Sequence, residues 1–239
     1  MPSKADLHIH STYSDGVATV LQILEHVATN TDLKVIAITD HNCINGAQYA
    51  SRLAHNFGIE IIVGEEISTI DGDLIGLFLD QPIAAGLSAR ESIQAIHAQG
   101  GLAVAPHPFD RSVSSLGQGS LPMSAYALDA IEGFNAGVYW FERSANFMAQ
   151  RLAEQISLPT LGSSDSHSLS TIGAAYTRFE GTSARDVYSA IKSHAVSFAG
   201  NYWRMGDYVG NWCKTIQQKG LAQFVRLAVA NSGYVQQGA

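Results

Sequence analysis

Histidines and acidic residues follow five short apolar segments of this chain, and these side chains hold zinc, manganese and iron in proteins. In chain order they are His8 and His10, Asp40 and His41, Glu65 and Glu66, His107, and Asp165 and His167. The segments before them are rich in β-branched residues, as strands are. Because the carboxyl ends of parallel strands meet on one face of a barrel, the sequence predicts a polynuclear metal site at a barrel mouth.

The spacing of these residues supports the same interpretation. His8 and His10 are two residues apart, as are Asp165 and His167. Side chains at this spacing on a strand point the same way, so each pair can converge on one metal ion. His107 lies between two prolines, which restrict the backbone and hold the imidazole in one direction. Each feature alone is a weak signal, whereas their joint position at successive strand ends indicates a metal site.

Alternating strands and helices are expected to position these residues. We expect strands at residues 5–9, 33–39, 60–63, 102–105, 130–134, 159–162 and 174–179, and an apolar run at 195–199. We expect helices at residues 20–28, 45–57, 88–100, 145–156 and 184–194. Thr19 with Gln22 and Ser88 with Glu91 have the spacing of capping boxes. A hairpin is expected to turn at residues 71–72.

Length and charge limit the class of protein. A chain of 239 residues with 46% apolar residues is typical of one α/β barrel. The formal net charge of −7, without a basic stretch, argues against stable binding of duplex nucleic acid but allows a nucleotide as substrate. We expect a barrel at residues 1–205 and a tail at 206–239, helical from about Asn211 to Val229, that packs on the barrel or on a partner. The oligomeric state is left open.

The cellular setting is predicted from two features. The two cysteines, Cys43 and Cys213, are too few and too far apart for a disulfide framework. No signal peptide is visible at the N-terminus, and no apolar run has the ~20 residues of a membrane span. We therefore expect a cytoplasmic protein without membrane contact.

A family resemblance rests on several motifs that occur together and in order. They are Asp6-Leu7-His8-Ile9-His10-Ser11-x-x-Ser14-Asp15-Gly16, Ile38-Thr39-Asp40-His41-Asn42, Gly64-x-Glu66-Ile67-Ser68, His107-Pro108 and Ser164-Asp165-x-His167. With these motifs the chain resembles the PHP (polymerase and histidinol phosphatase) family over residues 6–167.

The resemblance implies a fold and a cofactor. The fold would be α/β, a distorted (β/α)7 TIM-like barrel, with two or three divalent metal ions (Mn, Zn or Fe) at the C-terminal face of the strands. For the first metal, the implied ligands are His8 and His10, with Asp165 beside them. For the second metal they are His107 and Glu66, and Glu66 would also bridge to the first metal. The third metal would be bound by Asp15, His41 and His167.

Two positions in this ligand set leave alternatives open. Glu66 fits the Gly-x-Glu spacing of the family, but the neighbouring Glu65 is the alternative bridging residue. Asp73 stands where many members carry another histidine. An aspartate can bind manganese or iron, or else the second metal site is weak or empty. The number and identity of the metals therefore stay open.

The resemblance further implies a metal-dependent phosphoesterase that hydrolyses a small phosphate monoester, with a nucleotide or nucleoside bisphosphate as the first choice. Metal-bound hydroxide would be the nucleophile, and Asp165 and His167 would help to transfer a proton to the leaving group. Arg111, four residues past His107, is either a phosphate clamp or an ordinary exposed arginine. Asn135, at a strand end, either orients the substrate or caps the next segment.

Two other functions are considered. The same barrel and metals can hydrolyse a non-phosphate ester or an amide, because fold does not fix function. PHP-like domains can also act as non-catalytic modules attached to DNA polymerases. The near-complete ligand set and the lack of a polymerase segment count against the second alternative, while Asp73 and the apolar tail favour it.

Overall fold

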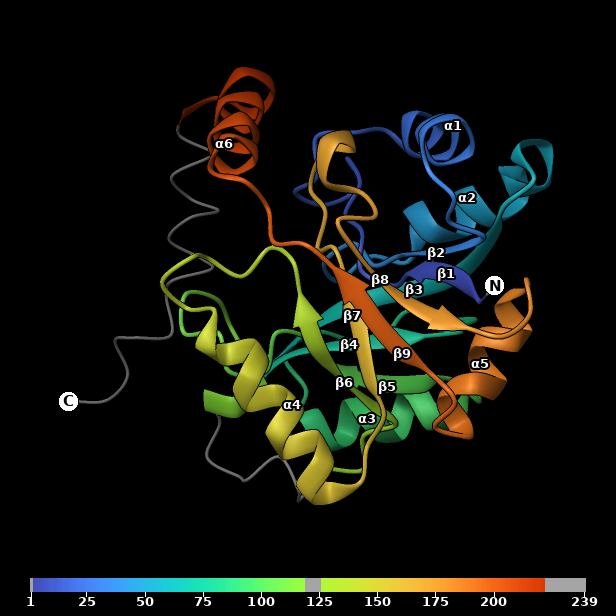
Figure 1. Ribbon diagram of the computed structural model, residues 1–239, viewed down its shortest axis with the longest axis vertical. Coiled ribbons are helices and arrows are strands. Elements are labelled where there is room, and N and C mark those ends of the chain that lie inside the picture. The colour runs from blue at the N-terminus through green and yellow to red at the C-terminus, as the bar shows by residue number, and fades with distance from the viewer. Residues whose placement is uncertain (1, 119–125, 222–239) are drawn as a thin grey trace.

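A computed structural model describes residues 2–118 and 126–221 (Figure 1). Its strands are β1 (Ser3–Asp6), β2 (Val35–Ile38), β3 (Glu60–Thr69), β4 (Gly72–Leu77), β5 (Leu102–Ala105), β6 (Ala130–Asn135), β7 (Thr160–Ser163), β8 (Ala175–Phe179) and β9 (Ser197–Gly200). Its α-helices are α1 (Val20–Asn30), α2 (Asn45–Leu53), α3 (Ala89–Ala98), α4 (Ser144–Ile156), α5 (Ala184–Lys192) and α6 (Met205–Lys219). Short 3-10 helices are η1 (Ala54–Phe57), η2 (Leu116–Gln118) and η4 (Leu169–Thr171).

The strands form one sheet in the order β7-β6-β5-β4-β3-β2-β1-β8-β9, which curls into a nearly closed barrel (Figure 1). Strands β1, β2 and β3 pair in parallel, as do β5, β6 and β7. Strand β4 is antiparallel to both of its neighbours, and β8 is antiparallel to β1 and β9. The predicted mixed α/β barrel is therefore confirmed, although the numbers of strands and helices depart from seven βα repeats.

The barrel closes where the segment after β1 meets the segment after β7. Ile9 and Ser166 form a parallel bridge, in which the His10 amide donates to the Ser166 carbonyl at 2.8 Å. In return, the Ser166 amide donates to the His8 carbonyl at 3.2 Å. This closure brings two segments that are more than 150 residues apart in sequence side by side at one end of the barrel.

A glycine permits close packing along the same seam. A Cβ atom at Gly162 of β7 would lie 2.7 Å from the Tyr176 carbonyl oxygen and 2.7 Å from Cβ of Phe198. The Gly162 amide donates to Thr177 Oγ1 of β8 at 3.0 Å, and that hydroxyl donates to the Gly162 carbonyl at 3.0 Å. Only a residue without a side chain lets β7 lie this close to β8 and β9.

A serine or threonine begins a capping box at the N-terminus of α1, α3 and α5. The predicted capping boxes at Thr19 with Gln22, before α1, and at Ser88 with Glu91, before α3, are confirmed. A third box joins Ser183 and Asp186 at the start of α5. Each box satisfies amide groups that the first helical turn leaves without a partner.

The predicted hairpin is present between β3 and β4. Its register runs from Gly64 opposite Leu77 to Thr69 opposite Gly72, so the chain turns within one residue of the expected position.

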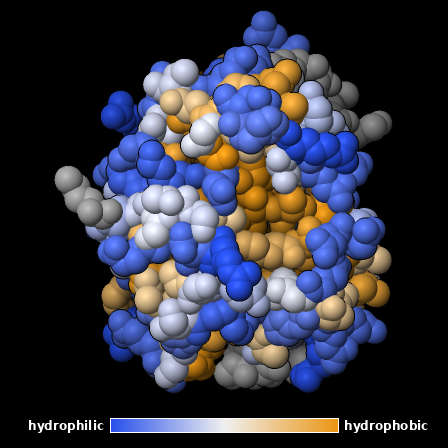
Figure 2. All heavy atoms as spheres, turned by 90° about the vertical axis from the view of Figure 1, so that its right-hand side faces the viewer, coloured by the Kyte–Doolittle hydropathy of each residue, from blue (hydrophilic) through white to orange (hydrophobic). Residues whose placement is uncertain are grey.

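The face to the right in Figure 1, beside α2 and α5, is mostly hydrophilic, and apolar side chains gather in a hollow near its middle (Figure 2). The connection between β5 and β6 contains η2, and residues 119–125 of this connection lie outside the described part of the chain.

The C-terminal helix differs from the prediction at its start. Helix α6 begins at Met205 rather than at Asn211, because the Asp207 carboxylate accepts a hydrogen bond from the Arg204 amide at 2.8 Å and so begins the helix earlier. Tyr208 of α6 is buried among Ala136, Trp203 and neighbouring residues. The rest of the predicted tail, residues 222–239, lies outside the described residues, and the division into barrel and tail stays a prediction.

Two findings concern the predicted membrane contact and the predicted state of the cysteines. Within residues 2–118 and 126–221, none of the helices has the length and apolar character needed to cross a bilayer. Cys43 and Cys213 are both free thiols. The cytoplasmic location stays a prediction.

Candidate metal centre

Four side chains converge at the centre of the barrel mouth, two from the segment after β1, one from within β3 and one from the segment after β7. His8 Nε2 and His10 Nε2 are 3.0 Å apart, and each lies 3.1 Å from Glu66 Oε2. Asp165 Oδ1 is 3.4 Å from both nitrogens. Ligand atoms that bind a cation at about 2.0–2.1 Å are separated from one another by about 3.0–3.4 Å. The spacing of the His8, His10 and Glu66 atoms therefore matches part of the coordination shell of one small divalent ion, and Asp165 lies beside the two histidines.

A second group shares two of these side chains. His107 Nε2 lies 3.1 Å from Glu66 Oε1, so the two carboxylate oxygens of Glu66 face different histidines. His8, His107 and Asp165 also form a set whose ligand atoms lie within 4.8 Å of one another. Glu66 thus lies between the two sets of histidines, and its predicted bridging role stays a prediction.

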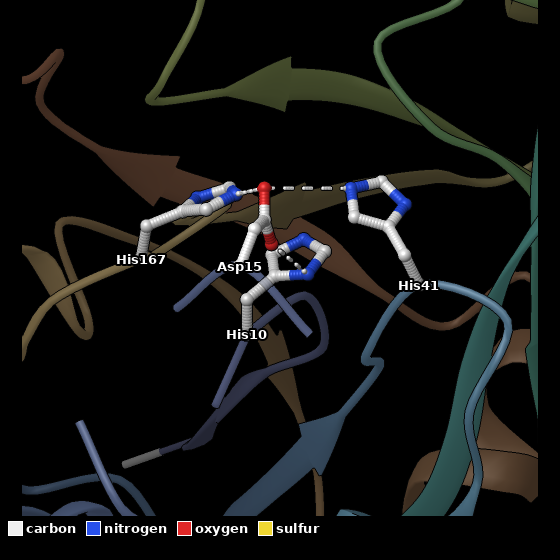
Figure 3. A group of neighbouring side chains, drawn as sticks. All are labelled: His10, Asp15, His41 and His167. Atoms are coloured by element: carbon white, nitrogen blue, oxygen red, sulfur yellow. Dashed lines mark hydrogen bonds and ion pairs between the residues drawn. The ribbon is translucent and has the colours of Figure 1, made fainter. Parts of the chain in front are cut away.

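A third group, His10, Asp15, His41 and His167, lies at the more open edge of the mouth (Figure 3). Asp15 Oδ2 is 3.1 Å from His167 Nε2 and 3.8 Å from His41 Nε2, and Asp15 Oδ1 is 3.5 Å from His10 Nδ1. The carboxylate of Asp15 therefore lies between three imidazole rings. The side chains of His41 and His167 are 26% and 24% exposed, so this group faces solvent.

All eight residues expected to bind metal lie in these three groups, with some changes of grouping. The expected third set, Asp15, His41 and His167, is joined by His10, while His8 and Asp165 also lie with His107. The alternative Glu65 points elsewhere, because its Oε2 accepts a hydrogen bond from the Ile83 amide at 2.8 Å. The geometry therefore favours Glu66 over Glu65 as the bridging residue.

Asp73 lies in β4 opposite Ser68 and outside the three groups. Its side chain is nearly buried, and burial together with the negative charge of Glu66 raises the pKa of Asp73 to about 7. The residue that departs from the family pattern is therefore a buried carboxyl group beside the candidate site.

The charges of the cluster create an environment that attracts cations. Although burial opposes protonation, the side chains of Asp165 and Glu66 raise the pKa of His10 to about 10. In the same way, and again against burial, the side chains of Glu66, Asp165 and Glu132 raise the pKa of His107 to about 9. The pKa of Asp165 lies well below its usual range despite burial, because His8 and other imidazoles surround it. A site that binds protons this tightly is suited to divalent cations.

The donor atoms fit divalent metal ions, which is the cofactor that the residue types indicate. His107 Nδ1 is fully buried and has no hydrogen-bond partner in the described structure. A buried imidazole nitrogen without a partner is costly unless the surroundings compensate for it. A set of imidazole nitrogens and carboxylate oxygens without a thiolate suits zinc, manganese and iron.

Glu132 holds two histidines of the cluster through hydrogen bonds, a role that was not predicted from the sequence. This residue of β6 is buried, and its Oε1 accepts a hydrogen bond from His8 Nδ1 at 2.9 Å. Its Oε2 accepts from the His107 amide at 2.8 Å and from the Asn135 side-chain amide at 2.9 Å. Glu132 thereby leaves His8 Nε2 facing the cluster, as carboxylate partners of metal-bound histidines do. A glutamate within the apolar strand at 130–134 was the available signal.

A second buried carboxylate fixes the loop that carries Asp15. Asp40 accepts hydrogen bonds from the amide and hydroxyl groups of Ser11, both at 2.7 Å, and from the hydroxyl of Ser14 at 2.7 Å. The Asp40-His41 pair at the end of β2 therefore divides its roles. Asp40 holds the loop, whereas His41 lies in the cluster.

Two residues of the cluster have a left-handed backbone. The φ angle is 29° at His107 and 53° at Asp165. Residues other than glycine rarely adopt these angles, and such strain gathers at functional sites. The backbone at both positions turns imidazole and carboxylate toward the same centre.

Two further residues were expected to contact substrate. The side chain of Arg111 is 75% exposed, and its guanidinium lies 3.3 Å from the Glu142 carboxylate. Asn135 is buried, and its side-chain amide donates to Glu132 and, at 3.1 Å, to Asp165 Oδ2. Arg111 therefore lies at the surface, while Asn135 holds the Asp165 carboxylate from inside the site.

Sequence comparison identifies the family. Residues 6–149 match the model of the PHP domain, and residues 143–196 match a PHP-associated region. The chain belongs to the PHP family. The predicted resemblance is therefore confirmed over more than half of the chain, including every residue from His8 to Asn135 in the site.

Several curated proteins are similar to this PHP protein. An uncharacterised protein of Methanocaldococcus jannaschii is 43% identical over 144 residues, which cover 56% of this chain and 82% of the relative. A second uncharacterised protein of that organism is 32% identical over 180 residues, which cover 74% and 70%. A 3′,5′-nucleoside bisphosphate phosphatase of Chromobacterium violaceum is 37% identical over 94 residues, but these cover only 36% of this chain and 33% of the relative.

Solved structures share the fold at low sequence identity. A two-domain protein of Bacteroides vulgatus, described as containing a predicted PHP-like metal-dependent phosphoesterase, matches with a TM-score of 0.68 and 17% identity over 84% of this chain and 65% of its own. The lesion-specific endonuclease Q of Pyrococcus furiosus matches with a TM-score of 0.60 and 18% identity over 81% of this chain and 56% of its own. These matches support the barrel fold of the PHP family.

Proposed function

We propose that this PHP protein is a metal-dependent phosphoesterase that hydrolyses a small phosphate monoester. The observation that carries the proposal is the convergence of His8, His10 and Glu66 at mutual distances of 3.0–3.1 Å, with Asp165 3.4 Å from both histidines and two further groups that share these members. Several ions in one site suit phosphate, whose oxygens carry negative charge that must be neutralised during transfer. A relative named as a bisphosphate phosphatase supports the same class of reaction.

Divalent ions held by these eight residues would supply an acidified water as nucleophile and positive charge for the phosphate oxygens. The protein's own residues keep this site in order. Glu132 holds His8 from behind at 2.9 Å, and Asn135 holds Asp165 at 3.1 Å. Because these partners are buried, the ligands that face the substrate lose little freedom when it binds.

We assign proton transfer to the edge of the site that solvent reaches. The side chains of Asp165 and His167 are 17% and 24% exposed, so both reach the open mouth. His167 Nδ1 donates to the backbone carbonyl of Asp165 at 3.0 Å, which leaves Nε2 pointing into the cluster toward Asp15. An imidazole held this way can deliver a proton at Nε2 to the departing alcohol oxygen when no ion occupies the third group, because one nitrogen cannot hold a metal ion and a proton together.

We propose Arg111 as a phosphate clamp that acts from the loop after His107. Its guanidinium is bound only at the surface, to Glu142, at distances of 3.3 Å and 3.4 Å. An exposed pair of this kind contributes little to stability, so the guanidinium can exchange the carboxylate for a substrate phosphate. Asn135 is proposed as a positioning residue, because its amide hydrogens already bind Glu132 and Asp165.

We propose a nucleotide or nucleoside bisphosphate as the substrate. The named relative from Chromobacterium violaceum supports this class, although it matches only part of each chain. A net charge of −7 favours a small ligand that metals can bind over a long polyanion. The similarity to endonuclease Q is a similarity of fold, so absence of stable duplex binding stays a prediction.

Adjacent glutamates provide a matched test. In Glu66→Gln, we expect metal content to fall and phosphate release from nucleotides with added manganese to drop by more than about 100-fold, because loss of outer partners alone costs about 10–100-fold. In Glu65→Gln, metal content and turnover should stay near those of the native protein, since Glu65 contacts the Ile83 amide instead. Equal activity of the two variants would contradict the proposed site.

A further inference from the structure

An aromatic cavity lies beside the metal centre and is absent from the mechanism described above. Its volume is about 460 Å³, and its walls include Trp140, Arg143, Tyr202, Trp203 and Tyr208. A second cavity of about 570 Å³ shares Tyr202 and Trp203 with it. Both volumes lie in the range of about 300–1,000 Å³ typical of small-molecule sites. The cavity is therefore large enough for part of a substrate.

One wall of this cavity is also a wall of the metal centre. The indole N–H of Trp203 donates to the carbonyl of Ser164, next to Asp165, at 2.9 Å. The Trp203 ring meets the His167 ring edge-on, with 6.4 Å between centroids. The backbone amide of Trp203 donates to the Ala136 carbonyl at 3.0 Å. A single side chain thus separates the cavity from the candidate proton donor.

The cavity is held open by aromatic contacts. Tyr208 donates its hydroxyl to the Val138 carbonyl at 2.9 Å and stacks on Tyr139 at 5.0 Å. These contacts fix α6 above the loop that precedes α4 (Figure 1). Trp140, at the edge of the cavity, is 60% exposed. A large exposed indole beside a packed aromatic wall is typical of a surface on which a flat ring stacks.

Two arginines give the cavity a positive charge. The Arg143 guanidinium lies 4.1 Å from the centroid of the Tyr202 ring, and Arg204 lines both cavities. Within the described residues, neither guanidinium forms an ion pair with a carboxylate, unlike Arg111. In an acidic protein, two cations left without carboxylate partners at a cavity indicate a ligand that brings its own negative charge.

We propose that this cavity is the subsite for the nucleoside part of the substrate. The base would stack against Trp140, and Arg143 and Arg204 would bind a phosphate that is not hydrolysed. The inference rests on the proposed phosphoesterase function and assigns its specificity to residues that lie outside the metal centre. It predicts a preference for nucleotides over phosphate esters that lack a base.

The test compares two esters that differ in the base, adenosine 5′-monophosphate and ribose 5-phosphate. In Trp140→Ala, we expect kcat/KM for the nucleotide to fall about tenfold, the effect of losing one base–aromatic stack, while kcat/KM for ribose 5-phosphate is unchanged. Phe147→Ala is the matched control, because Phe147 is an exposed aromatic residue (59%) outside the cavity. Equal loss with both esters would overturn the inference.

The arginines give a second, independent comparison. Arg143→Gln should weaken the binding of adenosine 3′,5′-bisphosphate, measured by calorimetry, more than that of the monophosphate. Arg151→Gln is the control. Arg151 lies in α4, and its guanidinium packs over the ring of Phe147 in the same helix. Equal weakening of both ligands would overturn the assignment of the second phosphate.

The results separate the proposed nucleoside subsite from the proposed phosphoesterase activity. Phosphate release from both esters at equal rates keeps the phosphoesterase and removes the subsite. Binding of the monophosphate that Trp140→Ala weakens, without turnover of either ester, keeps the subsite and removes the phosphoesterase. If Trp140→Ala changes the sedimentation of the protein but not nucleotide binding, the aromatic face is a protein interface and the subsite is wrong.

Discussion

Single residues of the metal centre have distinct physical roles. The sequence predicted the eight candidate ligands because ligands follow strands at recognisable spacings, and the structure brings all eight together. It did not predict Glu132, which touches His8 and His107. Glu132 lies inside an apolar strand and outside the motifs of the family, and its partners are distant in sequence. Only the closed barrel shows what that carboxylate contacts.

A substitution of Glu132 tests how much a single supporting side chain contributes to metal binding and turnover. In Glu132→Gln, the His8 ring loses its carboxylate partner, and we expect metal affinity or phosphate release to fall by about 10–100-fold. Metal content by mass spectrometry and turnover with added manganese would measure the effect. Glu154→Gln, at an exposed position of α4, is the control and should leave both unchanged. A Glu132→Gln protein with native affinity and rate would show that the hydrogen bond is dispensable.

The strands and helices were predicted to different degrees. Capping boxes at Thr19 and Ser88 and the hairpin between β3 and β4 depend on local sequence, and they were predicted correctly. The start of α6 was placed too late, because Asp207 and the Arg204 amide begin that helix without an apolar signal. The seam between β7 and β8 involves packing between distant segments, and no local pattern indicates it.

Two glycines test this packing with the same substitution. Gly162→Ala places a Cβ 2.7 Å from the Tyr176 carbonyl oxygen, so we expect the free energy of unfolding to fall by about 1–3 kcal/mol. Gly210→Ala lies in α6 with open space around it and should not destabilise the protein, since alanine favours a helix by about 1 kcal/mol. Urea unfolding measures both. Equal stability of the two variants would mean that the seam tolerates a side chain.

The whole molecule combines a compact barrel with a concentrated negative charge at its mouth. The buried carboxylates Glu66, Asp165 and Glu132 lie among imidazole groups whose pKa values they raise, and such an arrangement favours bound cations. The aromatic cavity under α6 adjoins this mouth through Trp203. We therefore propose the acidic centre as the place of reaction and the aromatic cavity as the source of specificity.

Metal content measured together with phosphate release would show whether the barrel mouth is a metal-dependent phosphoesterase site. The purified protein would be analysed for manganese, zinc and iron and then assayed on a nucleotide panel with added manganese. We expect two or three metal ions per chain, phosphate release from nucleotides, and loss of release when the ions are removed by a chelator. A protein that binds no metal even with manganese in excess, or that binds metal but releases no phosphate, would rule out the proposed function.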